Sequence, residues 1–186
     1  MDGIDGMLAS GSFFVILSIS IILVLSGVAI DQLIFIHLLL PCLIIFLLFN
    51  FSKNKIFLGD SGSLFLGYYI SFLILYSLKE YNLDIWVWLI LLSHFLVETT
   101  GTTLIRFIML KDWYKPHKSH AYQNLARILE NHKKVTLFAI IYNLFWLFPL
   151  AYFCITQPDY SAFLFLLSSF PVMVFTIKYG PIFSSD

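Results

Sequence analysis

The feature that most constrains this chain is a series of apolar segments, each close to the length of a membrane-spanning helix. Six can be distinguished, at residues 12–30, 33–51, 64–78, 85–110, 135–156 and 161–178. A helix needs about 20 mainly apolar residues to cross ~30 Å of hydrocarbon, so the short third segment must borrow residues from its flanks. Isolated strands would leave backbone groups unsatisfied in lipid. The sequence therefore predicts an all-α, polytopic integral membrane helix bundle with about six transmembrane helices.

Composition excludes the soluble class. Hydrophobic residues make up 60% of the 186 residues and charged residues only 12%, whereas soluble domains carry roughly 25% charged residues. The formal net charge of zero provides no basic field for nucleic acid, so no nucleic-acid partner is expected. Cys42 and Cys154 lie in apolar segments and are predicted to be buried packing residues without a disulfide. Without repeats or low-complexity stretches, residues 1–186 are expected to form a single membrane domain.

The basic residues predict the orientation of the bundle. Six crossings put ten of the eleven lysines and arginines on one side, leaving Lys79 on the other: Lys53, Lys55, Arg106, Lys111, Lys115, Lys118, Arg127, Lys133, Lys134 and Lys178. Short loops rich in Lys and Arg stay in the cytoplasm. Both termini are therefore expected to be cytoplasmic, and three polar motifs fall on that same face.

The first polar motif is "MDGIDG", which opens the chain and contains Asp2 and Asp5. On a helix, a separation of three residues would place both carboxylates on one face. The adjacent glycines would let a backbone or a phosphate approach closely. The acids could then hold a divalent cation or a polar substrate group. The alternative is a pair of solvated acids in ordinary Asp-Gly turns.

The second motif is "GDSGS", just before the third apolar segment. Asp60 could bind Mg²⁺, which takes few carboxylates together with waters and phosphate oxygens. Ser61 and Ser63 could cap the helix that begins near Leu64 and direct its amides at phosphate. The alternative is that Asp60 or Ser61 is simply a helix N-cap.

The third motif is "KPHKSHAYQNLAR", in the longest basic loop. His117 and His120 lie three residues apart, with Lys118 between them and Arg127 a short helix further on. Imidazoles and cations of this kind could clamp a pyrophosphate. A zinc site is less favoured, because no cysteine is near and the acids favour magnesium. The alternative is an ordinary basic cytoplasmic loop.

Ionisable residues also occur inside the fourth apolar segment. His94, Glu98 and Arg106 lie there among several threonines. Such groups are costly at membrane depth and usually face a protein interior or a wet cavity. The simpler interpretation is a hydrogen-bond network that holds helices together. The other is a transport pathway, which the clustering of the remaining polar motifs on one face disfavours.

Three polar motifs converging on one membrane face carry more weight than any of them alone. Together they indicate Mg²⁺-assisted phosphoryl transfer, in which positioning and charge neutralisation do most of the work.

These motifs resemble those of the polyprenyl-phosphate N-acetylhexosamine-1-phosphate transferases, glycosyltransferase family 4. "MDGIDGM" is similar to the end of that family's Asn- and Asp-containing motif, and "IFLGDSGSLFLGY" to its metal-site motif. "HKSHAYQ" is similar to its histidine loop, in the form found in enzymes that start O-antigen or similar surface glycans. The resemblance runs from Met1 to about Arg127.

The resemblance implies transfer of a sugar 1-phosphate from a UDP-N-acetylhexosamine to undecaprenyl phosphate, with release of UMP. It implies a multi-pass enzyme of the bacterial inner membrane, active at the cytoplasmic face in lipopolysaccharide or cell-wall biosynthesis. Mg²⁺ is the implied cofactor, with Mn²⁺ as an alternative, and a homodimer is compatible with it. By position, Asp60 is the implied metal ligand and Asp2 and Asp5 belong to the acidic site. His117 and His120 meet the diphosphate, and Lys118 stands where an arginine is common.

One departure from the family is large. Family members have about ten or eleven membrane helices and an Asp-Asp motif in their first half, whereas this chain has six apolar segments and no Asp-Asp pair. The chain is therefore expected to be the C-terminal half of a transferase. The alternative function is that of an inactive remnant, or of one part of a split transferase with no activity alone.

Overall fold

The computed structural model describes residues 4–51, 56–109 and 120–181, and all regular elements in these ranges are helical. In chain order they are α1 (Met7–Leu25), η1 (Ile30–Leu33), α2 (Ile34–His37), α3 (Leu40–Asn50), α4 (Gly59–Tyr81), α5 (Ile85–Met109), α6 (Ala121–Ile128), α7 (His132–Tyr142), η2 (Asn143–Leu147), α8 (Phe148–Thr156), η3 (Pro158–Tyr160) and α9 (Ser161–Tyr179).

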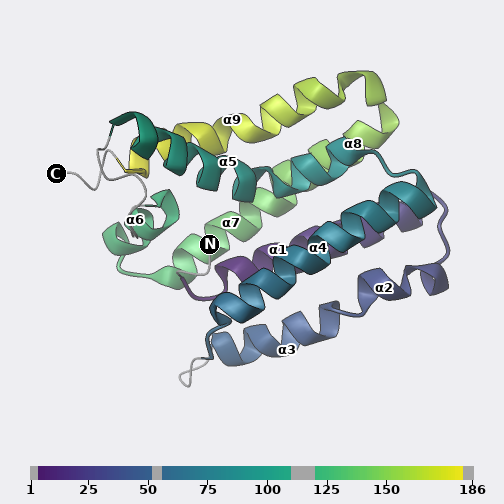
Figure 1. Ribbon diagram of the computed structural model, residues 1–186, viewed down its shortest axis with the longest axis horizontal. Coiled ribbons are helices and arrows are strands. Elements are labelled where there is room, and N and C mark those ends of the chain that lie inside the picture. The colour runs from purple at the N-terminus through teal and green to yellow at the C-terminus, as the bar shows by residue number, and fades with distance from the viewer. Residues whose placement is uncertain (1–3, 52–55, 110–119, 182–186) are drawn as a thin grey trace.

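The helices form a membrane bundle of the predicted size. Within the described residues, five helices are long and apolar enough to span a membrane, or six if one bent pair counts as a single span. The long helices run side by side between two ends of the molecule, and the start of α1 and the end of α9 lie toward the same end (Figure 1). The prediction of an all-α polytopic bundle with about six spans is confirmed.

The second span is bent, which the continuous apolar segment 33–51 did not predict. Ile30–His37 and Leu40–Asn50 meet at 43°. Pro41 explains the break, because it lacks the N–H that would bond to His37 and its ring clashes with that carbonyl. Two tyrosines of α4 hold the bent part in place: Tyr69 donates to the Phe35 carbonyl at 2.5 Å and Tyr81 to the Gln32 carbonyl at 2.7 Å.

Helix α1 lies at the centre of the bundle. About 61% of the apolar stretch that could span the membrane is buried in α1, compared with 22% in α4. It contacts α3, α4, α5 and α7, while α5 lies along α8 and α9. Trp88 of α5 is fully buried, and its indole N–H donates to Ser77 of α4 at 2.8 Å. Apolar burial around α1 and a few buried hydrogen bonds therefore hold the spans together.

Two further expectations are decided by the fold. The third span does borrow from its flanks, because α4 runs over Gly59–Tyr81. Both cysteines are free, as predicted. However, only Cys154 is buried, and the expectation of a buried Cys42 is wrong because α3 leaves that side chain exposed.

Candidate functional site

The polar motifs gather at one end of the bundle. The start of α1, the start of α4 and the short helix α6 all lie at the end where α9 finishes (Figure 1). Asp2, His117 and Lys118 lie outside the described residues. The remaining sequence-predicted site residues, Asp5, Asp60, Ser61, Ser63, His120 and Arg127, are all described.

Asp5 lies in a turn that leads into α1, not on a helix. Gly6 adopts φ 72°, a left-handed conformation that favours glycine, and a Cβ there would collide with the Phe51 ring. Asp5 is only 5% exposed, and its backbone carbonyl accepts a hydrogen bond from Thr136 at 2.7 Å. Its carboxylate lies 3.5 Å from Nδ1 of His132. Asp5 is therefore a buried carboxylate held by α7, which excludes a solvated acid at a frayed end.

His132 was missed by sequence reasoning. The preceding Asn131 caps α7, its side-chain oxygen accepting from the Lys134 amide at 3.2 Å. This cap sets His132 as the first residue of α7, facing the turn that carries Asp5. Because the two residues lie far apart in the chain, no local sequence signal could have paired them.

A small cavity connects the first two motifs. Its volume is about 130 Å³, and its lining includes Asp5, His132, Phe57 and Leu58. Leu58 lies two residues before Asp60. The side-chain amide of Asn50 donates a hydrogen bond to the Ile56 carbonyl at 2.7 Å, which fixes the segment that leads into α4. The turn that carries Asp5 and this segment therefore line the same cavity.

Asp60 and Ser61 lie in the first turn of α4, and Ser63 follows at the start of the second turn. Helix α4 begins at Gly59, and no side chain caps it, so the expected capping by Ser61 or Ser63 from outside the helix is wrong. Ser63 instead donates to the Asp60 carbonyl at 3.0 Å. The Asp60 side chain is exposed, at the end of α4 where the helix dipole favours negative charge. No group of three or more His, Cys, Asp or Glu suited to a metal ion occurs among the described residues.

His120 is held by a carboxylate from the membrane span α5. Its Nδ1 lies 3.1 Å and 3.2 Å from the two oxygens of Glu98. Glu98, only 2% exposed, also accepts the Ala121 amide at 2.9 Å and the Thr102 hydroxyl at 3.3 Å. A carboxylate oxygen is the usual acceptor in such a contact, so the geometry favours the tautomer with its hydrogen on Nδ1 of His120. Glu98 thereby caps α6 and orients the imidazole of its N-cap residue.

Glu98 provides hydrogen bonds between helices, as the interpretation of this segment as a network that holds helices together predicts. Glu98 bonds across to α6, whereas the His94 ring makes no hydrogen bond to Glu98. Arg106 is buried in the last turn of α5. The charge of Glu98 at membrane depth identifies it from the sequence as a residue with an internal role, although its partner in α6 could not be predicted.

Arg127 lies at the far end of α6 from His120, two turns away. It donates to the Asn124 side chain at 3.2 Å, and Asn124 in turn donates to the Tyr179 carbonyl at 2.7 Å. These contacts attach α6 to the end of α9. Arg127 is exposed, so its guanidinium is accessible to a ligand from water.

Apolar packing joins the first motif to the third. Ile4 and Met7 form a buried cluster with Tyr122 and Ala126 of α6 and Val135 of α7. Thus the structure brings Asp5, the helix that carries His120 and the entry to α4 to one end of the bundle. Within the described residues, no hydrogen bond or ion pair joins the Asp60 side chain to Asp5 or His120.

Comparisons with known proteins agree with the motif analysis. Residues 1–78 match the model of glycosyl transferase family 4. The "Probable undecaprenyl-phosphate N-acetylglucosaminyl 1-phosphate transferase" of Bacillus subtilis (strain 168) is 34% identical over 153 residues, covering 81% of this chain. The chain spans 42% of that relative's length. No solved structure gives a significant match.

Proposed function

We propose that this chain forms the C-terminal part of a membrane phospho-glycosyltransferase. The proposal starts from the confirmed resemblance to glycosyl transferase family 4. The reaction proposed is transfer of an N-acetylhexosamine 1-phosphate from a UDP-sugar to undecaprenyl phosphate, with release of UMP. The observation that carries the proposal is the gathering of three family-like motifs at one end of a membrane bundle (Figure 1). That is where a water-soluble nucleotide sugar can meet a lipid phosphate.

Asp60 is the proposed magnesium ligand. Mg²⁺ is commonly bound by one or two carboxylates plus waters and substrate phosphates, so a single exposed carboxylate is a suitable protein ligand. Asp60 fits this requirement because its side chain is exposed and has no hydrogen-bond partner among the described residues. When bound, Mg²⁺ or Mn²⁺ would neutralise negative charge on the diphosphate.

The other polar residues of the three motifs would bind and orient the substrates. Ser61 lies in the first turn of α4, whose backbone amides attract phosphate, and Ser63 follows directly after it. His120, held at Nδ1 by Glu98, would present its imidazole in one orientation toward the diphosphate. Arg127, with His117 and Lys118 of the same motif, would supply further hydrogen bonds to phosphate oxygens. Asp5, with Asp2, would complete the acidic part of the site.

The location and product are part of the same proposal. The excess of Lys and Arg in the sequence segments that carry or adjoin the motifs supports a cytoplasmic site in a bacterial inner membrane. The lipid-linked sugar formed there would start a surface glycan such as O-antigen or a cell-wall polymer.

The proposal is tested by measuring UMP release from UDP-N-acetylglucosamine, and separately from UDP-N-acetylgalactosamine, in membranes containing the chain, undecaprenyl phosphate and Mg²⁺. Because the chain spans less than half of its relative, the assay is run with the chain alone and with the relative's remaining segment co-expressed. Activity only in the second case identifies one part of a split enzyme. No UMP release in either case overturns the proposal.

Asp159→Asn provides the matched control for Asp60→Asn. Asp159 is also exposed, but it lies in η3 at the opposite end of the bundle. Loss of activity in Asp60→Asn with full activity in Asp159→Asn supports the assigned site. Equal activity in both variants contradicts the role of Asp60.

A further inference from the structure

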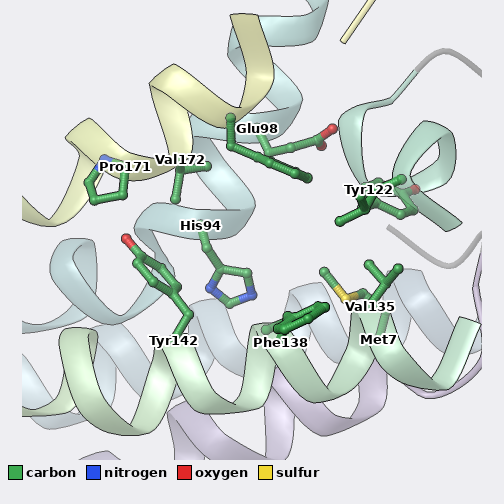
Figure 2. A pocket seen from close by; sticks show the side chains of 12 residues that line it. Met7, His94, Glu98, Tyr122, Val135, Phe138, Tyr142, Pro171 and Val172 are labelled. Atoms are coloured by element: carbon green, nitrogen blue, oxygen red, sulfur yellow. The ribbon is translucent and has the colours of Figure 1, made fainter. Parts of the chain in front are cut away.

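The short helix α6 is held by two membrane spans. Glu98 of α5 accepts from the Ala121 amide at 2.9 Å, which fixes the beginning of α6. Figure 2 shows this carboxylate directed toward the helix that carries Tyr122. The body of α6 lies against α9. His120 at the N-cap and Arg127 in the last turn therefore both depend, for their positions, on spans outside the third motif.

Asn124 connects the middle of α6 to the end of α9. It is only 2% exposed, and its side-chain nitrogen donates to the carbonyls of Tyr179 at 2.7 Å and Gly180 at 3.2 Å. The last carbonyls of a helix have no partner within that helix, so a buried helix end needs a donor from elsewhere. The two N–H groups of one amide match these two carbonyls.

The same amide also holds Arg127. Because Nδ2 of Asn124 faces the two carbonyls, Oδ1 faces the other way, where it accepts from Nη1 of Arg127 at 3.2 Å. A flipped amide would place Oδ1 against two carbonyl oxygens, so the contacts determine its orientation. Arg127 is exposed, and an exposed arginine samples many rotamers unless a fixed partner restricts it. Asn124 is such a partner, because α9 fixes it in turn.

Helices α5 and α9 pack closely enough to act as one support for α6. A Cβ on Gly101 of α5 would lie 3.3 Å from Cγ2 of Thr176 of α9, so the two helices approach each other closely at this point. Glu98 lies three residues before Gly101, and Tyr179 lies three residues after Thr176. Both attachment points of α6 are therefore within one helical turn of this close contact.

We propose that Asn124 is a positioning residue of the transferase site, which holds the Arg127 guanidinium where it would bind the diphosphate. The same contact makes the end of α9 part of that site. The inference rests on the proposed function, since it requires Arg127 to bind the diphosphate. It adds a helix that lies outside all three motifs and outside the family match over residues 1–78.

A double-mutant cycle tests whether Arg127 acts through Asn124. The assay is UMP release by the full chain, with the relative's remaining segment co-expressed. Arg127→Gln removes the guanidinium and is expected to lower kcat/KM about tenfold in the parent chain. Asn124→Leu is close to isosteric but can neither donate nor accept. In that background Arg127→Gln should lower kcat/KM by about twofold or less, because the guanidinium is already out of position.

Ser77→Ala is the matched control, because it also removes a buried side-chain hydrogen bond, the one that Trp88 donates to Ser77. In this background Arg127→Gln should again lower kcat/KM about tenfold, which separates loss of coupling from general destabilisation. Hydrogen exchange of the full chain in detergent tests the attachment itself. The amides of α6 should exchange faster in Asn124→Leu than in Ser77→Ala.

The outcomes distinguish a failure of the positioning role from a failure of the function on which it rests. No UMP release from the parent chain overturns the proposed function, and the positioning role with it. If the parent releases UMP but Arg127→Gln has the same effect, or none, in all three backgrounds, the positioning role alone is overturned. Unchanged exchange of the α6 amides in Asn124→Leu overturns the role of Asn124 in attaching α6 to α9.

Discussion

Glu98 and Asp60 are both carboxylates at the polar end of the molecule, but their surroundings are opposite. Glu98 is 2% exposed within a membrane span and accepts hydrogen bonds from His120, Ala121 and Thr102. Asp60 is exposed in the first turn of α4 and has no side-chain partner among the described residues. A buried carboxylate must be satisfied internally, so it is fixed in place, whereas an exposed one remains available to a ligand. Glu98 therefore positions His120 and α6, whereas Asp60 is the carboxylate proposed to bind a ligand.

Asp5 resembles Glu98 more than Asp60. It is buried, it lies beside a histidine, and its backbone carbonyl is bonded by Thr136. Two carboxylate–histidine pairs, one from α5 to α6 and one from the α1 turn to α7, thus brace the end of the bundle where Asp60 is exposed.

The largest expected effect is that of changing Asp60, the exposed carboxylate. Asp60→Asn should lower UMP release at least about 100-fold, because it removes the proposed metal ligand. The free energy of unfolding should fall by no more than about 1 kcal/mol, the contribution of the α4 dipole, since the Asp60 side chain holds no other element in place. A loss as large as that of Glu98→Leu would show that Asp60 is structural, and the contrast with Glu98 would be lost.

Glu98→Leu should have the next largest effect, on stability. It leaves the Ala121 amide and His120 without their acceptor and should reduce the free energy of unfolding by about 2 kcal/mol. Glu98→Gln is the control, because an amide oxygen can still accept from Ala121. Detergent-based unfolding and hydrogen exchange at Ala121 measure the effect. If Glu98→Leu is as stable as the parent chain, Glu98 is not the bracing residue.

Thr136→Val should have a smaller effect. The isosteric change removes the hydrogen bond to the Asp5 carbonyl and should cost about 1 kcal/mol, because that acceptor is buried. Thr156→Val serves as the control, since Thr156 is exposed and bonds only within its own helix. Equal unfolding midpoints for the two variants would argue against a role of α7 in holding Asp5.

The smallest expected effect is that of His132→Asn. His132 is 46% exposed at the side chain, so its contact with Asp5 is partly screened and should contribute about 0.5 kcal/mol or less. The change should instead appear in the kinetics of UMP release if the proposed acidic site depends on this pair. A stability loss as large as that of Glu98→Leu would make the two pairs equivalent and remove the distinction between them.

Some positions in the site could be predicted locally and others could not. A lone acid among small residues before an apolar run predicts Asp60 as a site residue, and that signal lies within a few residues. The acids of the first motif predict Asp5 in the same way, but the sequence leaves open a solvated turn, which the burial of Asp5 beside α7 excludes. The capping roles expected of Ser61 and Ser63 are wrong because α4 begins earlier, at Gly59.

The sequence by itself determined the class of protein, the approximate spans, their alternating direction and the family resemblance. Each of these depends on hydropathy, charge or motif within a short stretch of chain. Only the tertiary structure decided the 43° bend of the second span, the burial of Asp5, the attachment of His120 to Glu98 and that of Asn124 to the end of α9. These features depend on contacts between residues distant in the chain, which exist only after the helices have packed together.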